Sequence, residues 1–527
     1  MNRPNILLIT SDQHRGDCYG FAGRGVHTPH LDQLRAQGTW LRNCITPNVV
    51  CQPARASMLT GLLPLTHGVC DNGIDLPEDM AERGFAAHLS RHGARTGFIG
   101  KAHFSTYKSY EPTGRPECIE SSADFDASQW SGPYMGFEHV ELMLVGHNWF
   151  LPEAPPRGLH YERWFHADGQ GEARNRLYKT ALPPDTGTPQ TFHSALPVAW
   201  HNSTWVADRT IAFMRDQAKA QHSTNSSAKA TPNNSADPDS PFVLWASFPD
   251  PHHPFDAPVP WSLLHKPEQV DLPPHRLRDL DQRPWWHRAA LENAPAEREG
   301  FRQIREQYSR MPILDDRQLR ELIANYYGMI SLVDHNVGRI LTELDALGLS
   351  ENTYVVFTAD HGDWLGDHGL VLKGPMMYDG LLRVGALVRG PGVPAAATVT
   401  QPVSTLDLSE TFADWLQAPS PESHGQSWSD VLIHGETRQA ALNEWGLGAA
   451  RCGVALDLRT VRTERYRMTI DRGSGAGELY DLLLDPHELD NRFDDASFAS
   501  VRQSLQDLIN TRPDDIRPEP LPRIGQA

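Results

Sequence analysis

Two pairs of polar residues directly follow apolar segments that are typical of buried β-strands, and their side chains suit a divalent cation. They are Asp12 and Gln13 after residues 5–10, and Asp360 and His361 after residues 353–358. The carboxyl ends of parallel strands meet along one edge of an open α/β sheet, so these side chains are expected to converge. Oxygen-rich ligands suit Ca²⁺ or Mg²⁺. The alternative is that Asp12 and Asp360 only cap the segments that follow them.

A cysteine in an unusual setting is a candidate nucleophile. It opens the run Cys51-Gln52-Pro53-Ala54-Arg55-Ala56-Ser57-Met58-Leu59-Thr60-Gly61. Pro53 suits the first turn of a helix, where free amide groups and the helix dipole favour a bound anion. A lone cysteine before a helix is usually a small buried apolar residue, and that is the alternative here.

This run resembles the signature of the type I sulfatases, in which Cys-x-Pro-x-Arg is followed by Thr-Gly. In that family the cysteine is oxidised after translation to formylglycine, an aldehyde whose hydrate is the nucleophile. The resemblance implies that Cys51 is catalytic, that Arg55 stabilises the nucleophile and that a formylglycine-generating enzyme matures the protein. It further implies an alkaline phosphatase-like fold, one divalent metal ion and hydrolysis of sulfate monoesters.

The resemblance also implies a set of metal ligands, with two departures from the usual pattern. The set is Asp12, Gln13, Cys51, Asp360 and His361. Many members of the family carry a second aspartate at the position of Gln13 and an asparagine at that of His361, and phosphonate monoester hydrolases share both departures. Ca²⁺ is expected, but an imidazole ligand suits Mn²⁺ better, so Mn²⁺ and Mg²⁺ stay open.

Three further runs resemble the family's sulfate-binding segments. They are Gly100-Lys101-Ala102-His103, Pro251-His252-His253-Pro254 and Leu372-Lys373-Gly374. The resemblance implies that Lys101 and Lys373 contact the sulfate, and that His252 lies at the leaving-group oxygen with His253 as its neighbour. It also implies that His103 assists breakdown of the covalent intermediate. Without the resemblance, an exposed lysine is the usual case for the run at Lys101, and a turn stiffened by two prolines with a solvent-facing histidine is the alternative for residues 251–254.

Two other functions remain open on the same residues. Gln13 and His361 favour a phosphonate monoester or phosphodiester hydrolase, whereas Lys101 and His103 oppose it because those hydrolases generally lack this pair. A catalytically silent member that binds a sulfated ligand requires an unconverted Cys51.

The substrate stays open among aryl, sugar and alkyl sulfates. Aromatic residues of the segment 105–201 are candidate walls of the pocket. They are Tyr107, Tyr110, Trp130, Tyr134, Phe137, His147, Trp149 and Phe150. For any one of them, packing beneath a long loop is the alternative.

Composition describes a globular protein with an acidic surface. The chain has 527 residues, 39% of them hydrophobic, and 48 basic against 66 acidic residues give a net charge of −18. Nucleic acid and anionic membranes are therefore not expected as partners. We expect a cytoplasmic protein with free thiols, because no secretory signal, membrane-spanning run or paired cysteine spacing is seen.

The elements that must position the site predict an α/β protein of two unequal parts. Residues 1–435 are expected to form a mainly parallel sheet sandwiched by helices, with insertions over 105–201 and a flexible loop over 218–240. Residues 436–527 are expected to form a smaller α+β part with a short antiparallel sheet. The stretch after Thr511 is expected to be an extended arm that could embrace a neighbouring subunit in a homo-oligomer.

Overall fold

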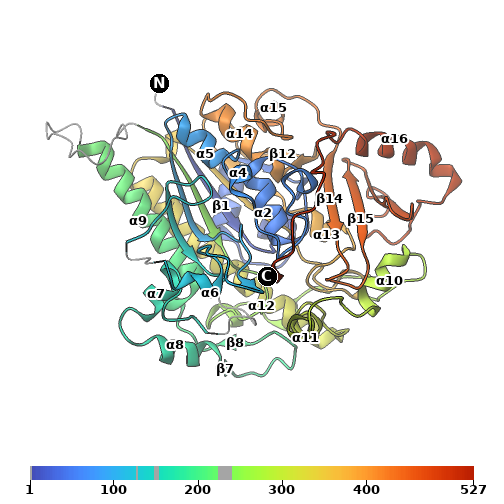
Figure 1. Ribbon diagram of the computed structural model, residues 1–527, viewed down its shortest axis with the longest axis horizontal. Coiled ribbons are helices and arrows are strands. Elements are labelled where there is room, and N and C mark those ends of the chain that lie inside the picture. The colour runs from blue at the N-terminus through green and yellow to red at the C-terminus, as the bar shows by residue number, and fades with distance from the viewer. Residues whose placement is uncertain (1–2, 126–128, 147–152, 224–239, 527) are drawn as a thin grey trace.

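A large central sheet organises the protein (Figure 1). The structure is a computed structural model, and it describes residues 3–125, 129–146, 153–223 and 240–526. The sheet has the strand order β12-β2-β11-β10-β1-β9-β4-β6. Its strands are β1 (Asn5–Ser11), β2 (Thr39–Leu41), β4 (Arg95–Lys101), β6 (His139–Met143), β9 (Phe242–Phe248), β10 (Thr353–Ala359), β11 (Ala386–Arg389) and β12 (Ala397–Val399).

The middle of this sheet is parallel, as predicted. β10, β1, β9, β4 and β6 run in one direction, whereas β11 is antiparallel to both of its neighbours. Every residue of β1, β9 and β10 is buried. Continuous apolar runs of this kind are typical of strands that are covered on both faces.

Helices cover both faces, which confirms the predicted sandwich. Ile6 and Leu8 of β1 face one core cluster, and Leu7 and Ile9 face the other. The helices on the first face are α2 (Cys51–Thr60), α5 (Phe85–Arg91) and α14 (Leu408–Trp415). Those on the second face are α1 (Pro29–Gln37), α7 (His160–His166), α9 (Asn202–Ser223) and α12 (Asp316–Ala346).

The C-terminal part is a four-stranded antiparallel sheet with one helix, drawn in orange and red in Figure 1. It consists of β14 (Ala441–Leu447), β15 (Leu456–Arg462), β16 (Tyr466–Asp471), β17 (Gly477–Asp481) and α16 (Ala499–Ile509). Helix α16 packs on this sheet through Leu505 and Ile509. This arrangement confirms the predicted smaller α+β part.

Two expectations about the connecting segments need correction. The segment 105–201 does not only lie over the sheet, because its β6 extends the sheet at the edge. The predicted loop over 218–240 begins inside helix α9, which continues to Ser223, and its remainder from 224 to 239 lies outside the described residues.

The expected C-terminal arm lies on its own chain. The amide of Arg517 donates to the carbonyl of Leu65 at 2.9 Å, and that of Ile524 donates to Gly73 at 2.9 Å. The arm ends in β18 (Gly525–Gln526), which pairs with β5 (Lys108–Ser109). The C-terminus therefore lies near the middle of the molecule in Figure 1.

Short elements connect these units. They are β3 (Cys44–Ile45), β7 (Ala181–Leu182), β8 (His193–Ser194), β13 (Val403–Ser404), α3 (Pro64–His67), α4 (Glu78–Ala81), α6 (Ile119–Ser122), α8 (Gly171–Tyr178), α10 (Trp285–Glu292), α11 (Glu299–Tyr308), α13 (Asp379–Leu382) and α15 (Ser429–Leu432). All six cysteines lie in the described ranges and carry free thiols. Among the described helices, none combines the length and the apolar character needed to cross a bilayer.

Candidate functional site

The carboxyl ends of the parallel strands β1, β10 and β4 carry three of the predicted polar residues. Asp12 follows β1 and Asp360 follows β10, and the last residues of these two strands, Ser11 and Ala359, are register partners. Lys101 is the last residue of β4. Because β10, β1, β9 and β4 are adjacent and parallel, these side chains lie at one edge of the sheet.

Cys51 lies close to the two aspartates. It is the first residue of α2 and is fully buried. Its Sγ atom lies 3.7 Å from Oδ1 of Asp12 and 3.2 Å from Nε2 of His361. The ligand atoms of Asp12, Cys51, Asp360 and His361 all lie within 4.8 Å of one another.

Arg55 holds the two carboxylates in place from one turn further along α2. Its Nε atom lies 2.9 Å from Asp360, and its NH2 atom lies 3.1 Å from Asp12. Its NH1 atom donates to the carbonyl of Lys101 at 2.6 Å and to Oγ of Ser247 at 2.8 Å. Buried charges are tolerated where such hydrogen bonds are complete. The guanidinium group of Arg55 thus joins both carboxylates to the end of β4 and to Ser247.

The donor atoms around Cys51 fit a divalent cation. Nδ1 of His361 lies 2.9 Å from the carbonyl of Gly362, so this nitrogen carries the proton and Nε2 keeps its lone pair toward the cluster. Nε2 of Gln13 donates to Asp363 at 2.6 Å, which leaves its Oε1 atom as the ligand. Two carboxylates, an amide oxygen and an imidazole suit a hard or borderline divalent ion.

A positive charge already lies among these donors. The Nζ atom of Lys373 is 3.1 Å from Oε1 of Gln13, from Sγ of Cys51 and from Nε2 of His361. This ammonium group therefore occupies the place where a metal ion would contact the same donor atoms. It also shows that Gln13 faces the same space as the other predicted ligands.

The charges of the site depend on one another. Burial opposes ionisation of Asp12, but the nearby cations, Lys101 first among them and then Arg55 and Lys373, hold its pKa well below the usual range. Burial and Asp12 oppose ionisation of the Cys51 thiol, but nearby cations, Lys373 first among them, lower its pKa. Three cations, Arg55, Lys101 and Lys373, face the two carboxylates, so this group of five carries one excess positive charge. The site is thus suited to anions although the whole chain is acidic.

Three histidines line one small cavity with Cys51, Lys101 and Lys373. They are His103, His252 and His253. Burial, reinforced by the nearby lysines, holds the pKa of each well below its usual value, so all three are neutral. Nδ1 of His252 lies 2.7 Å from the carbonyl of His253, which leaves Nε2 of His252 available to a ligand.

His103 differs from the other two histidines in the state of its ring nitrogens. It is 3% exposed, and neither of its ring nitrogens has a hydrogen-bond partner among the residues that the structure describes. Its backbone is fixed by Glu117, which accepts hydrogen bonds from the amides of His103, Phe104 and Ser105. A fixed, unpartnered imidazole in a cavity is poised to exchange a proton with a bound molecule.

Several residues of the site were not predicted. Asp363 orients Gln13, and its place two residues after His361 was the signal that could have found it. Asn72, Arg305, Ser309 and Arg451 also line the cavity. They come from three distant segments of the chain, since Arg305 and Ser309 lie four residues apart at the end of α11, and none carries a local sequence motif.

Only part of the predicted aromatic wall is found among the described residues. Tyr107 lines the cavity. Tyr134 and Phe137 instead pack on the core, as does Trp130. Tyr110 contacts Phe301 of α11 with ring centroids 5.0 Å apart. The remaining candidates, His147, Trp149 and Phe150, lie outside the described residues.

Comparisons with known proteins agree with this geometry. A family model described as "Sulfatase" matches residues 4–418, and one described as "N-sulphoglucosamine sulphohydrolase, C-terminal" matches residues 366–514. The "Uncharacterized sulfatase YidJ" of Escherichia coli is 26% identical over 98% of this chain and 88% of its own length. An "Arylsulfatase" of Clostridium perfringens is 26% identical over 96% of this chain and 94% of its own. The phosphonate monoester hydrolase of Agrobacterium radiobacter has a similar structure, with a TM-score of 0.69 and 25% identity over 97% of this chain and 95% of its own.

Proposed function

We propose that this chain, which belongs to the sulfatase family, hydrolyses sulfate monoesters after oxidation of Cys51 to formylglycine. The observation that carries the proposal is the position of Cys51, buried between the carboxylate cluster and the ammonium group of Lys373. A thiol packed as a mere apolar side chain has no need of these charged neighbours.

Two groups would complete the chemistry of the site. The aldehyde supplies, once hydrated, two hydroxyl groups on one carbon, one to attack sulfur and one whose deprotonation releases sulfate. A divalent ion held by Asp12, Gln13, Asp360 and His361 supplies Lewis-acid stabilisation of negative charge. We propose Ca²⁺, with Mn²⁺ and Mg²⁺ as alternatives, and a separate maturation enzyme as the source of the aldehyde.

The chain's own residues then have distinct tasks. Lys101, which contacts Asp12, and Lys373, which contacts Cys51, neutralise the sulfate oxygens, where fixed charges stabilise a transition state most effectively. Lys373 or His252 delivers a proton to the departing alcohol oxygen. His252 is neutral in the free protein, so it takes this role only when the bound anion raises its pKa. Unpartnered His103 accepts the proton whose loss releases sulfate.

A phosphonate monoester hydrolase is the second candidate function. Gln13 and His361 favour it, and so does the likeness to the Agrobacterium enzyme. Lys101 opposes it, because its contact with Asp12 at 2.7 Å places a second lysine in the site.

A comparison of two substrates decides between the candidates. Protein produced together with a formylglycine-generating enzyme is assayed with 4-nitrophenyl sulfate and with the 4-nitrophenyl ester of phenylphosphonate. The proposal expects the larger kcat/KM for the sulfate. A larger value for the phosphonate would support the second candidate, and loss of both activities with an intact aldehyde at position 51 would contradict both.

A further inference from the structure

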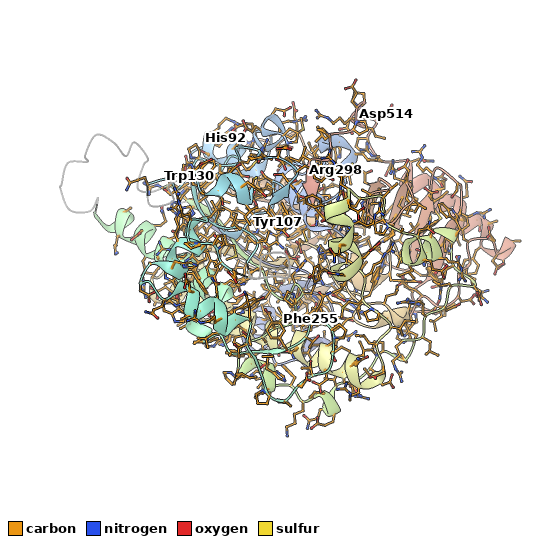
Figure 2. All side chains as sticks on the ribbon, turned by 60° about the horizontal axis from the view of Figure 1, so that its bottom comes forward. His92, Tyr107, Trp130, Phe255, Arg298 and Asp514 are labelled. Atoms are coloured by element: carbon orange, nitrogen blue, oxygen red, sulfur yellow. The ribbon has the colours of Figure 1, made fainter. Side chains whose placement is uncertain are left out.

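Two arginines from outside the sulfatase-like motifs line the cavity that contains Cys51. Arg305 lies on α11, and Arg451 lies between β14 and β15. Figure 2 labels Tyr107, which lines the same cavity, and Arg298, which precedes α11. Two guanidinium groups thus line the cavity in addition to Lys101 and Lys373.

Arg305 is buried without full compensation. It is 3% exposed, and its Nε and NH2 atoms have no hydrogen-bond partner within the described part of the chain. Its NH1 atom makes only a long contact with Ser309, at 3.4 Å, and the nearest carboxylate oxygen, on Glu297, is 3.7 Å from NH2. A buried guanidinium group in this state is costly to the fold and is retained where a ligand completes it.

The neighbouring acidic groups are already engaged elsewhere. Asp71 forms hydrogen bonds with Arg451 at 2.7 Å and with Arg523 at 3.0 Å. Glu297 accepts from Arg523 at 3.1 Å and from Tyr110 at 2.7 Å. Among these described residues, the guanidinium groups of Arg305, Arg451 and Arg523 face the carboxylates of Asp71 and Glu297, which leaves one excess positive charge. Burial is the largest cause and repulsion from Arg451 the second in lowering the pKa of Arg305 to about 9.

The wall that carries Arg305 is held in place by the C-terminal arm. Arg523 of the arm bridges Asp71 and Glu297, and β18 pairs with β5. The guanidinium carbon of Arg298 lies 3.8 Å from the ring centroid of Tyr110. These contacts hold α11 against the insertion, and Arg305 on this helix lines the same cavity as Cys51.

We infer that Arg305 binds a second anionic group of the substrate, carried by the alcohol part of the sulfate ester. The inference rests on the proposed function. A guanidinium group with two free donor atoms pairs best with a planar or tetrahedral oxyanion, such as a carboxylate or a second sulfate. A neutral alcohol part leaves the charge of Arg305 uncompensated, so anionic sulfate esters are the substrate class.

Matched sulfate esters test this subsite. The probes are 4-carboxyphenyl sulfate, its neutral amide 4-carbamoylphenyl sulfate and 1,4-phenylene disulfate. Each is assayed with the wild-type protein, with Arg305→Gln, with Arg305→Lys and with Arg302→Gln, an exposed position on the same helix. The ratio of kcat/KM for each anionic probe to that for the amide removes differences in folding between variants.

We expect Arg305→Gln to lower the ratio of kcat/KM for an anionic probe to that for the amide by about 10- to 100-fold, the size of the loss of a charged contact. Arg302→Gln should leave the ratio unchanged. Arg305→Lys keeps part of the preference, because it retains the charge without the planar fork. Loss of preference for the carboxylate alone or for the disulfate alone identifies the oxyanion. Equal losses for the amide and both anions, or no change in the ratio, would overturn the inference.

A binding measurement separates this result from the proposed function. Calorimetry with the inactive Cys51→Ala protein compares the same three probes, with and without Arg305→Gln. If the matured wild-type protein hydrolyses no sulfate ester, but Arg305→Gln weakens the binding of the anionic probes only, the subsite is upheld and the proposed activity is rejected. Hydrolysis without any Arg305-dependent discrimination in either measurement rejects the subsite and upholds the activity.

Discussion

The Nζ atom of Lys373 lies 3.1 Å from the Sγ atom of Cys51, in the space between the thiol and the candidate metal ligands. The same ammonium group is 3.1 Å from Nε2 of His361 and from Oε1 of Gln13. A divalent ion held by these donors would displace Lys373 from them by charge repulsion. Lys373 is then available to the sulfate of a substrate.

The first prediction concerns this exchange of one cation for another. Without metal, Lys373→Met should lower the free energy of unfolding by about 1–3 kcal/mol, because the donors that faced the ammonium group lose their partner. With saturating Ca²⁺ the loss should be smaller. Chemical unfolding with and without a chelator measures both values, and a Lys373→Met protein of wild-type stability in chelator would contradict the arrangement.

The second prediction concerns the central arginine. Arg55→Ala should lower the free energy of unfolding by about 3–5 kcal/mol, because it leaves the buried carboxylates of Asp12 and Asp360 without their partner. Arg91→Ala is the control, since its pair with Glu82 is exposed and such pairs contribute little. Similar values for the two variants in urea unfolding would show that Arg55 does not hold the carboxylates together.

The third prediction concerns the amide that stands where many relatives of this family carry a carboxylate. Gln13→Glu should be destabilised, because its new carboxylate faces Oδ2 of Asp363 where the amide donated at 2.6 Å. The double variant Gln13→Glu/Asp363→Asn should recover about 1–3 kcal/mol, because asparagine restores a donor. Additive losses in the double-mutant cycle would show that the two side chains are not coupled.

The fourth prediction concerns the histidine that lacks partners. His103→Gln should slow steady-state turnover of 4-nitrophenyl sulfate more than it slows the first turnover, because the proton acceptor for sulfate release is lost. Stopped-flow measurement should therefore show a burst of nitrophenol that is absent from the wild type. If both phases slow by the same factor, His103 acts in the attack on sulfur instead.

The fifth prediction concerns the residue that positions His103. Glu117→Gln keeps the shape of the side chain but weakens its role as acceptor of three backbone amides. It should lower kcat with little change in KM, because the loop that carries His103 loses its anchor. A change in KM alone would indicate that this loop only binds substrate.

The central site was predictable because its residues follow from local patterns. Asp12 and Asp360 end continuous apolar runs, and β1 and β10 pair in the register that brings them together. Cys51 stands in a run that matches a family signature at several positions. Strand ends and helix starts thus fix where these side chains meet, because the carboxyl ends of parallel strands lie along one edge of the sheet.

The outer part of the site was not predictable from local patterns. Arg305 enters the cavity only because α11 packs beside the insertion, and Arg523 supports it only because the C-terminal arm returns to β5. The contacts of the arm join segments more than 200 residues apart in the sequence. The extended arm was predicted, but its partner is its own chain.

The aldehyde at position 51 is tested most directly by relating activity to the modification. Protein is produced with graded amounts of a formylglycine-generating enzyme. Mass spectrometry of the peptide that contains Cys51 gives the aldehyde fraction, and hydrolysis of 4-nitrophenyl sulfate gives the specific activity. We predict a straight line through zero, with no activity in the thiol form. A thiol form as active as the converted protein would contradict the proposed function.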